Sequence, residues 1–103
     1  MQRSDRILLE KILDAIEDAI EIFGDASKEN FLTSKALKLS MAMSVIRVGE
    51  LVKNLTLEFR HANPHVPWRS IAGYRDVAAH KYDALDFNRL YITIKEEFPE
   101  LQL

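Results

Sequence analysis

Apolar side chains recur every three or four residues along most of this 103-residue chain, and only short breaks interrupt them. This is the period of an amphipathic α-helix, and no segment alternates convincingly between apolar and polar residues as a half-buried strand would. The breaks lie at Gly24, at residues 61–67 and between Asp83 and Asp86. The pattern predicts an all-α fold, a four-helix up-and-down bundle without a sheet.

The first predicted helix begins at Ser4 or Asp5, either of which can cap it. It ends at Gly24, because glycine readily adopts the left-handed conformation that closes many helices. Its apolar stripe consists of Leu8, Ile12, Ile16, Ala19 or Ile20, and Phe23. This stripe faces the core of the predicted bundle.

The second predicted helix is long and runs from about Thr33 to Arg60, with Asn30 or Thr33 as its cap. Residues 39–46 are apolar or small almost all the way round, so more than one face of this helix needs cover. The remaining helices of the bundle can supply that cover, and so can a second protomer. The sequence leaves both alternatives open.

Two prolines, Pro64 and Pro67, end the long helix, and Pro67 suits the first turn of a third one. Asp86 can cap a fourth helix, which Pro99 ends. The third helix carries Trp68, Ile71, Tyr74, Val77 and Ala78, and the fourth carries Phe87, Leu90, Tyr91 and Ile94. We interpret Trp68 as a packing anchor rather than a platform for stacking bases.

Composition narrows the class of protein. The length predicts a single domain over residues 1–103. A chain this short buries only a modest fraction of its surface, so contacts with a partner would add to its stability. The absence of cysteine excludes disulfides, thiolate zinc sites and a thiol nucleophile. No stretch approaches the roughly 20 apolar residues of a membrane span. We therefore expect a cytoplasmic protein without a membrane partner.

Charge is distributed unevenly along the chain. Residues 1–30 carry a net charge of −4, residues 31–82 carry +5 and residues 83–103 carry −3. The middle segment can present a basic face to a phosphate backbone. Ordinary variation along a mixed-charge surface explains the pattern equally well. The charge distribution is therefore compatible with RNA binding but does not demonstrate it.

Four polar residues with useful chemistry stand close together near the end of the third predicted helix. Asp76 and His80 are four residues apart, so the carboxylate can hold an imidazole nitrogen. Arg75 lies on one stripe with Tyr82 but about 140° round the helix from His80. One protomer therefore displays half a site, and two protomers can pool two arginines and two histidines.

This grouping suits metal-independent RNA cleavage. A histidine can take the proton from the ribose 2′-hydroxyl and another can protonate the departing 5′-oxygen, while arginine stabilises the charge on the phosphate. Without further information, a helical histidine near an aspartate is more often a satisfied surface or core group than a catalyst.

Other polar residues have simpler interpretations. Arg69 can assist phosphate binding, although a surface charge is the plainer reading. Arg47 and Glu50 form an intrahelical pair in the simplest case, and Glu50 facing Arg75 or Arg69 is the alternative. His61 and His65 are four residues apart, but Asn63-Pro64 breaks the helix between them, so we expect no metal site.

The run Arg75-Asp76-Val77-Ala78-Ala79-His80-Lys81-Tyr82 resembles the signature of the HEPN superfamily: arginine, a polar residue, three further residues and histidine. The tyrosine two residues later is similar to the HepT-like toxin branch. Residues 67–73, Pro-Trp-Arg-Ser-Ile-Ala-Gly, and residues 48–50, Val-Gly-Glu, also resemble that branch. The likeness covers most of the chain, from the first helix to Asp86, and a four-helix architecture agrees with it.

The resemblance implies a homodimeric endoribonuclease toxin that needs no cofactor or metal and has one composite site for RNA. Arg75 would bind the scissile phosphate, His80 would be the acid and base, and Asp76 would orient the site. A minimal nucleotidyltransferase antitoxin would neutralise the toxin by attaching AMP to Tyr82. The bulky anion would fill the cleft and offset the charge of Arg75.

Two other functions remain open at this stage. The first is a non-catalytic HEPN module that binds a nucleotidyltransferase partner or a nucleotide. The second is a helical dimerisation protein, which the apolar long helix favours. The pair Arg75 and His80 favours the enzyme, because a pure scaffold would not need both residues.

Overall fold

The computed structural model describes residues 2–81 and 84–102, and over these ranges the chain forms helices and no strand. The elements are α1 (Arg3–Phe23), α2 (Lys28–Thr33), α3 (Lys35–Lys53), α4 (Leu57–Ala62), α5 (Trp68–His80), α6 (Phe87–Ile92), the π-helical η2 (Thr93–Glu97) and α7 (Phe98–Leu101). The last three follow one another without a gap. The prediction of an all-α helical bundle is confirmed for the described residues.

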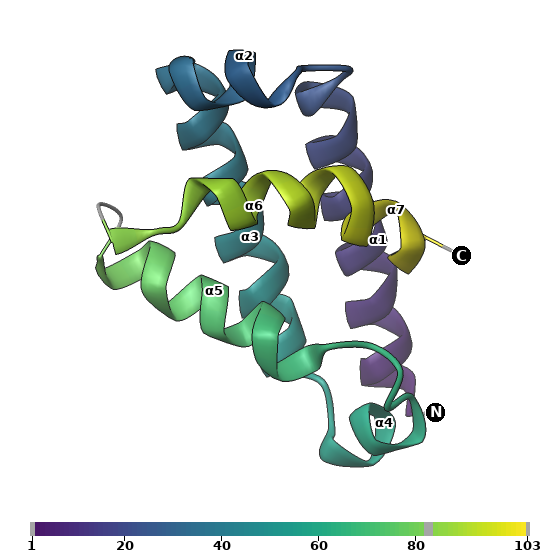
Figure 1. Ribbon diagram of the computed structural model, residues 1–103. Coiled ribbons are helices and arrows are strands. Elements are labelled where there is room, and N and C mark those ends of the chain that lie inside the picture. Colours follow the sequence, from purple (N-terminus) through teal and green to yellow (C-terminus); the bar gives the residue numbers. More distant parts are fainter. Residues whose placement is uncertain (1, 82–83, 103) are drawn as a thin grey trace.

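The first two long helices, α1 and α3, lie side by side and antiparallel, and the short α2 connects them at one end (Figure 1). The segment α5 and the segment α6–α7 are inclined across this pair, and α5 makes its most extensive contact with α3 (Figure 1). Helix α3 is therefore the central element, packed between α1 and α5.

The prediction of one helix from Thr33 to Arg60 is wrong, because the chain breaks twice in this range and forms α2, α3 and α4. Each of the three begins with a hydroxyl that caps it, a device that satisfies backbone N–H groups at a helix start. The hydroxyl oxygens of Ser27, Ser34 and Thr56 accept hydrogen bonds of 3.1 Å from the backbone N–H groups of Asn30, Leu37 and Phe59. Asn30 and Thr33, the predicted caps, lie inside α2.

The prediction that Ser4 or Asp5 caps the first helix is wrong, because α1 already begins at Arg3 after Gln2. Asp5 is buried instead. Its side chain is only 1% exposed. The carboxylate accepts hydrogen bonds from the backbone N–H of Thr56 (2.9 Å) and from its hydroxyl (2.7 Å). Asp5 thus fastens the start of α1 to the start of α4, and these bonds satisfy the buried charge.

Of three other predicted helix boundaries, two are confirmed and one is wrong. Gly24 follows α1 with a φ of 59°, and Asp86 caps α6 by accepting a hydrogen bond of 3.2 Å from the N–H of Arg89. Pro99 does not end the last helix, because it lies in the first turn of α7, where its missing N–H costs little. The wider π-helical turns of η2 directly precede this helix.

Helix α3 has one buried face and one exposed edge. Met41, Val45 and Val48 are in the core, whereas Leu39 is 56% exposed and Met43 is 63% exposed. The core of the protomer thus covers only part of the apolar surface of this helix. Leu39 and Met43 form an uncovered apolar edge, which we call the α3 edge.

Candidate active site

The site begins with the close crossing of α3 and α5. Gly49 is buried on α3, and a Cβ atom at this position would collide with Cβ of Arg75 and lie 3.1 Å from the carbonyl oxygen of Ile71. The two helices therefore approach as closely as they do only because residue 49 has no side chain. This contact fixes the backbone of Arg75 against α3.

The guanidinium of Arg75 lies between two carboxylates. Its Nε donates to Oε2 of Glu50 at 2.7 Å, and its Nη1 donates to Oδ1 of Asp76 at 3.1 Å. The pKa of Arg75 is raised above its ordinary value, mainly because Asp76 accepts this hydrogen bond; burial opposes the shift and the charge of Glu50 adds to it. The side chain is 23% exposed, and its Nη2 has no hydrogen bond within the described residues. Arg75 can thus offer Nη2 to a phosphate oxygen.

Asp76 contacts cations instead of His80. Its Oδ1 accepts from Nζ of Lys53 at 2.9 Å as well as from Arg75. The pKa of Asp76 is held below its ordinary value, first by the hydrogen bond from Lys53 and then by the one from Arg75. Among residues 2–81 and 84–102, no hydrogen bond joins Asp76 to His80, so the predicted pairing is not formed there. Two cations from two helices compete successfully for the carboxylate.

His80 is the last residue of α5 and is exposed. Within the part of the chain that the structure describes, its imidazole has no hydrogen-bond partner, so both ring nitrogens are open to a ligand. His80 and Asp76 are four residues apart and share a face of α5, whereas Arg75 projects toward α3. The two principal candidates therefore face different directions from one helix.

The remaining sequence predictions have mixed outcomes. Glu50 faces Arg75, and Arg47 pairs with Asp18 of α1 at 2.8 Å, so the predicted Arg47–Glu50 pair is wrong. Arg69 is exposed in the first turn of α5. Tyr82, the predicted modification site, lies outside the described residues.

Lys53 was not among the residues predicted from the sequence, and the structure brings it to the site. It lies three residues after Glu50 on α3, so both project from a similar side of that helix and both reach α5. The spacing of Glu50 and Lys53, next to Gly49, is the sequence signal from which their contacts with α5 could have been predicted.

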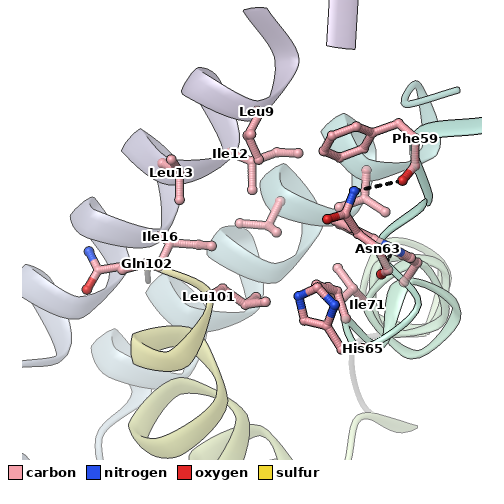
Figure 2. Close-up of a pocket in the computed structure, with 14 residues that line it drawn as sticks. Leu9, Ile12, Leu13, Ile16, Phe59, Asn63, His65, Ile71, Leu101 and Gln102 are labelled. Atoms are coloured by element: carbon pink, nitrogen blue, oxygen red, sulfur yellow. Dashed lines mark hydrogen bonds between the residues drawn. The ribbon is translucent and has the colours of Figure 1, made fainter. Parts of the chain in front are cut away.

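An apolar pocket of about 260 Å³ lies elsewhere, between α1, α3, the start of α5 and the C-terminal residues (Figure 2). Leu9, Ile16 and Leu101 line it together with the polar residues His65 and Asn63 (Figure 2). None of Arg75, Asp76 and His80 contributes to its wall. This apolar pocket is therefore separate from the candidate active site.

Trp68 supports this region as a packing residue, which confirms the sequence interpretation. Its Nε1 donates to the carbonyl oxygens of Arg60 (3.2 Å) and Asn63 (3.0 Å), and its ring packs against Phe59 with centroids 6.1 Å apart. The indole thereby holds α4 and the following loop against the start of α5.

Comparison with known proteins identifies the family of this chain. A family model described as "Ribonuclease HepT-like" matches residues 12–103. A "Putative RNase" of Caldanaerobacter subterraneus subsp. tengcongensis is 38% identical over 100 residues, which cover 97% of this chain and 89% of that protein. A "Probable ribonuclease HepT" of Thermococcus cleftensis is 34% identical over 102 residues, with 99% and 93% covered.

This chain belongs to the HepT-like ribonuclease family. The resemblance to HEPN proteins and the assignment as a ribonuclease are thereby confirmed at the level of the family. A "Gamma-glutamylcyclotransferase and putative RNase" of Methanocaldococcus jannaschii is 33% identical over 102 residues, and the chain spans 46% of that protein. No solved structure matches the chain.

Two further findings concern metal-ligating side chains and membrane-spanning helices. Over residues 2–81 and 84–102, no three His, Cys, Asp or Glu side chains gather in a way that could hold a metal ion. No helix within those ranges is long and apolar enough to cross a membrane.

Proposed function

We propose that this HepT-like protein is a metal-independent endoribonuclease toxin with one composite site per homodimer. The observation that carries the proposal is the state of two side chains on α5. Arg75 is held in place by Glu50 and Asp76 with Nη2 left over, and His80 is exposed with both nitrogens open. A fixed cation and a free imidazole are the groups that cleavage by the neighbouring 2′-hydroxyl requires.

The reaction is a transesterification at phosphorus. One His80 takes the proton of the ribose 2′-hydroxyl, and the 2′-oxygen forms a bond to phosphorus. The bond from phosphorus to the 5′-oxygen breaks, and a protonated imidazole supplies the proton that this oxygen needs. Arg75 stabilises the charge on the non-bridging oxygens. The products are a cyclic 2′,3′-phosphate and a free 5′-hydroxyl.

A second protomer completes the site in this proposal. Arg75 and His80 face different directions on one helix, so a phosphate bound by one of them does not meet the other across the helix axis. The α3 edge, Leu39 and Met43, offers apolar surface for a partner. Glu50 is seven residues after Met43 and lies on the same stripe of α3, so a dimer along this edge brings the partner close to Arg75.

A partner nucleotidyltransferase regulates the toxin by attaching AMP to Tyr82. Tyr82 follows His80 by two residues in the sequence, and an AMP group on it would add a bulky anion to this end of the motif. Mass spectrometry after co-expression with a minimal nucleotidyltransferase tests this: the wild type gains the mass of AMP and Tyr82→Phe does not. If the wild type and Tyr82→Phe both carry AMP on a residue other than residue 82, the assignment to Tyr82 is contradicted.

The experiment that tests the catalytic proposal is cleavage of total cellular RNA by purified protein in EDTA. His80→Ala should abolish cleavage while retaining the helical circular-dichroism spectrum of the wild type. His65→Ala is the matched control, because His65 is also exposed but lies on the loop before α5. Equal cleavage by wild type and His80→Ala contradicts the proposal. No cleavage by either favours a non-catalytic module that binds the nucleotidyltransferase or a nucleotide.

A further inference from the structure

A groove of about 710 Å³ lies between α4 and the first half of α5. Three basic residues line it: Arg60 and His61 from the end of α4, and Arg69 from the start of α5. The one acid in its wall is Asp76. Lys53 and Arg75 both bind that carboxylate, so the groove as a whole is basic.

The basic side chains of this groove lack anionic partners in the described chain. Arg69 and His61 form no ion pair or hydrogen bond there. Nε of Arg60 is buried without a hydrogen-bond partner. A buried donor without an acceptor is unfavourable and rare in folded proteins. Arg47 and Arg89, by contrast, pair with Asp18 and Glu97. Arg60 and Arg69 therefore bring positive charge to the groove that no acid of the described chain neutralises.

The groove is continuous with the candidate active site. Asp76 belongs to both, because it lines the groove and contacts Arg75. Arg69, Asp76 and His80 lie on one face of α5, since they are separated by seven and four residues. The distance from Arg69 to His80 along the helix axis is about 16 Å, which is the length of several stacked nucleotides.

Gly73 leaves the middle of this face without a side chain. A Cβ atom there would have nothing within 4 Å, so packing inside the protomer does not require a glycine. Glycine destabilises the interior of a helix, yet it allows a ligand to approach the backbone closely. Its place in the groove wall, between Arg69 and Asp76, suits a bound chain.

We infer that this groove binds the phosphate backbone of the single-stranded RNA substrate, in the segment that lies on one side of the cleaved bond. This inference rests on the proposed function. Arg60 and Arg69 contact phosphates, since the guanidinium fork fits their oxygens. The ring of Trp68 is packed against Phe59 and its Nε1 is bonded, so it is not free to read a base. Binding in the groove is therefore independent of sequence and sensitive to salt.

The test uses the full chain and a fluorescein-labelled single-stranded oligoribonucleotide carrying 2′-O-methyl groups, which cleavage through the 2′-hydroxyl cannot attack. Fluorescence anisotropy gives its dissociation constant at several salt concentrations. Arg60→Gln/Arg69→Gln should raise this constant roughly tenfold and make the salt slope shallower by about 0.7 per arginine. The control Lys28→Gln/Lys35→Gln removes equal charge from α2 and the start of α3, at the other end of the molecule from α4 (Figure 1). It should bind as the wild type.

If the double variant folds poorly, the single variant Arg69→Gln still tests the inference. Arg69 is exposed, so its replacement should leave the fold intact. It should still make the salt slope shallower by about 0.7. Unchanged affinity and slope for Arg69→Gln, or for a folded double variant, overturn the inference and leave the groove to a protein partner.

Cleavage of unmodified RNA separates this inference from the proposed function. The double variant should raise KM and keep kcat, since neither arginine touches the scissile phosphate. A wild type that binds the oligonucleotide through the groove but cuts no RNA refutes the proposed function alone. A wild type that cuts RNA, with unchanged KM and binding in the variants, refutes the groove alone.

Discussion

Gly49 of α3 lies directly against the Cβ atom of Arg75 on α5, with no room for a side chain between the two helices. The neighbouring residue on α3, Glu50, binds the guanidinium of Arg75 at 2.7 Å. One pair of adjacent residues therefore sets both the backbone position and the side-chain direction of Arg75. The site depends on how α3 and α5 pack as much as on its polar groups.

Gly49→Ala should disturb this packing directly. The added methyl group collides with Arg75, so the helices must separate, and we expect a loss of about 1–3 kcal/mol in the free energy of unfolding. RNA cleavage should fall because Arg75 moves with α5. Denaturant unfolding and cleavage rates measure the two effects. The control is Gly73→Ala, which meets no atom and should stabilise the protein by about 0.5–1 kcal/mol. Equal unfolding midpoints for the two variants would refute the packing argument.

Glu50→Ala should slow cleavage without unfolding the protein. It removes the acceptor at Nε of Arg75 and leaves the guanidinium oriented by Asp76 alone. We expect a decrease of roughly 10- to 100-fold in kcat, the range typical of a misplaced catalytic group. Glu50→Gln retains an acceptor oxygen and should recover part of the rate. Single-turnover kinetics at saturating RNA provide the comparison, and a wild-type rate for Glu50→Ala would show that Glu50 does not position Arg75.

Asp5→Asn should lower the melting temperature at neutral pH by several degrees. Hydrogen bonds from the backbone N–H and the hydroxyl of Thr56 hold the pKa of Asp5 below its ordinary value, the backbone bond contributing most. A carboxyl with a lowered folded-state pKa stabilises the fold above its unfolded pKa of about 4, and this contribution disappears as the pH falls through the folded value. The difference between wild type and variant should therefore shrink below about pH 4. Melting curves followed by circular dichroism would refute this if the difference were the same at pH 3 and pH 7.

Leu39→Glu/Met43→Glu should convert the proposed dimer to a monomer. These residues are 56% and 63% exposed, so two new charges do not disturb the core of the protomer. They would meet like charges across a two-fold interface, which disfavours association. Light scattering after size-exclusion chromatography measures the mass. Ile7→Glu, at an exposed apolar residue on α1, is the control and should remain dimeric. A dimeric double variant would place the interface elsewhere.

Local signals explain which parts of the fold the sequence predicted. Gly24 and Asp86 mark helix ends through their own backbone or side chain, and both predictions are confirmed. The breaks at Ser34 and Thr56 had the same kind of signal in their hydroxyls. They were missed because apolar residues continue in helical spacing on both sides of each break.

Contacts between distant segments explain what the sequence could not predict. Asp5 and Thr56 are 51 residues apart, and no local pattern connects them. Asp76 has a histidine at the right spacing on its own helix, yet Lys53 and Arg75 bind it, because α3 packs close enough to α5 through Gly49. The motif named Arg75 and His80 as candidates, whereas the partners of Arg75 and Asp76 depended on helix packing.

The most direct test of a composite site is the cleavage rate of dimers mixed from wild-type and His80→Ala protomers. After subunit exchange at equal amounts, random pairing leaves about one quarter of the dimers with two His80 side chains. If one histidine is the base and its counterpart the acid, the rate should fall to about one quarter of that of the wild type. A rate of about one half would mean that each protomer cleaves RNA on its own, which contradicts the composite site.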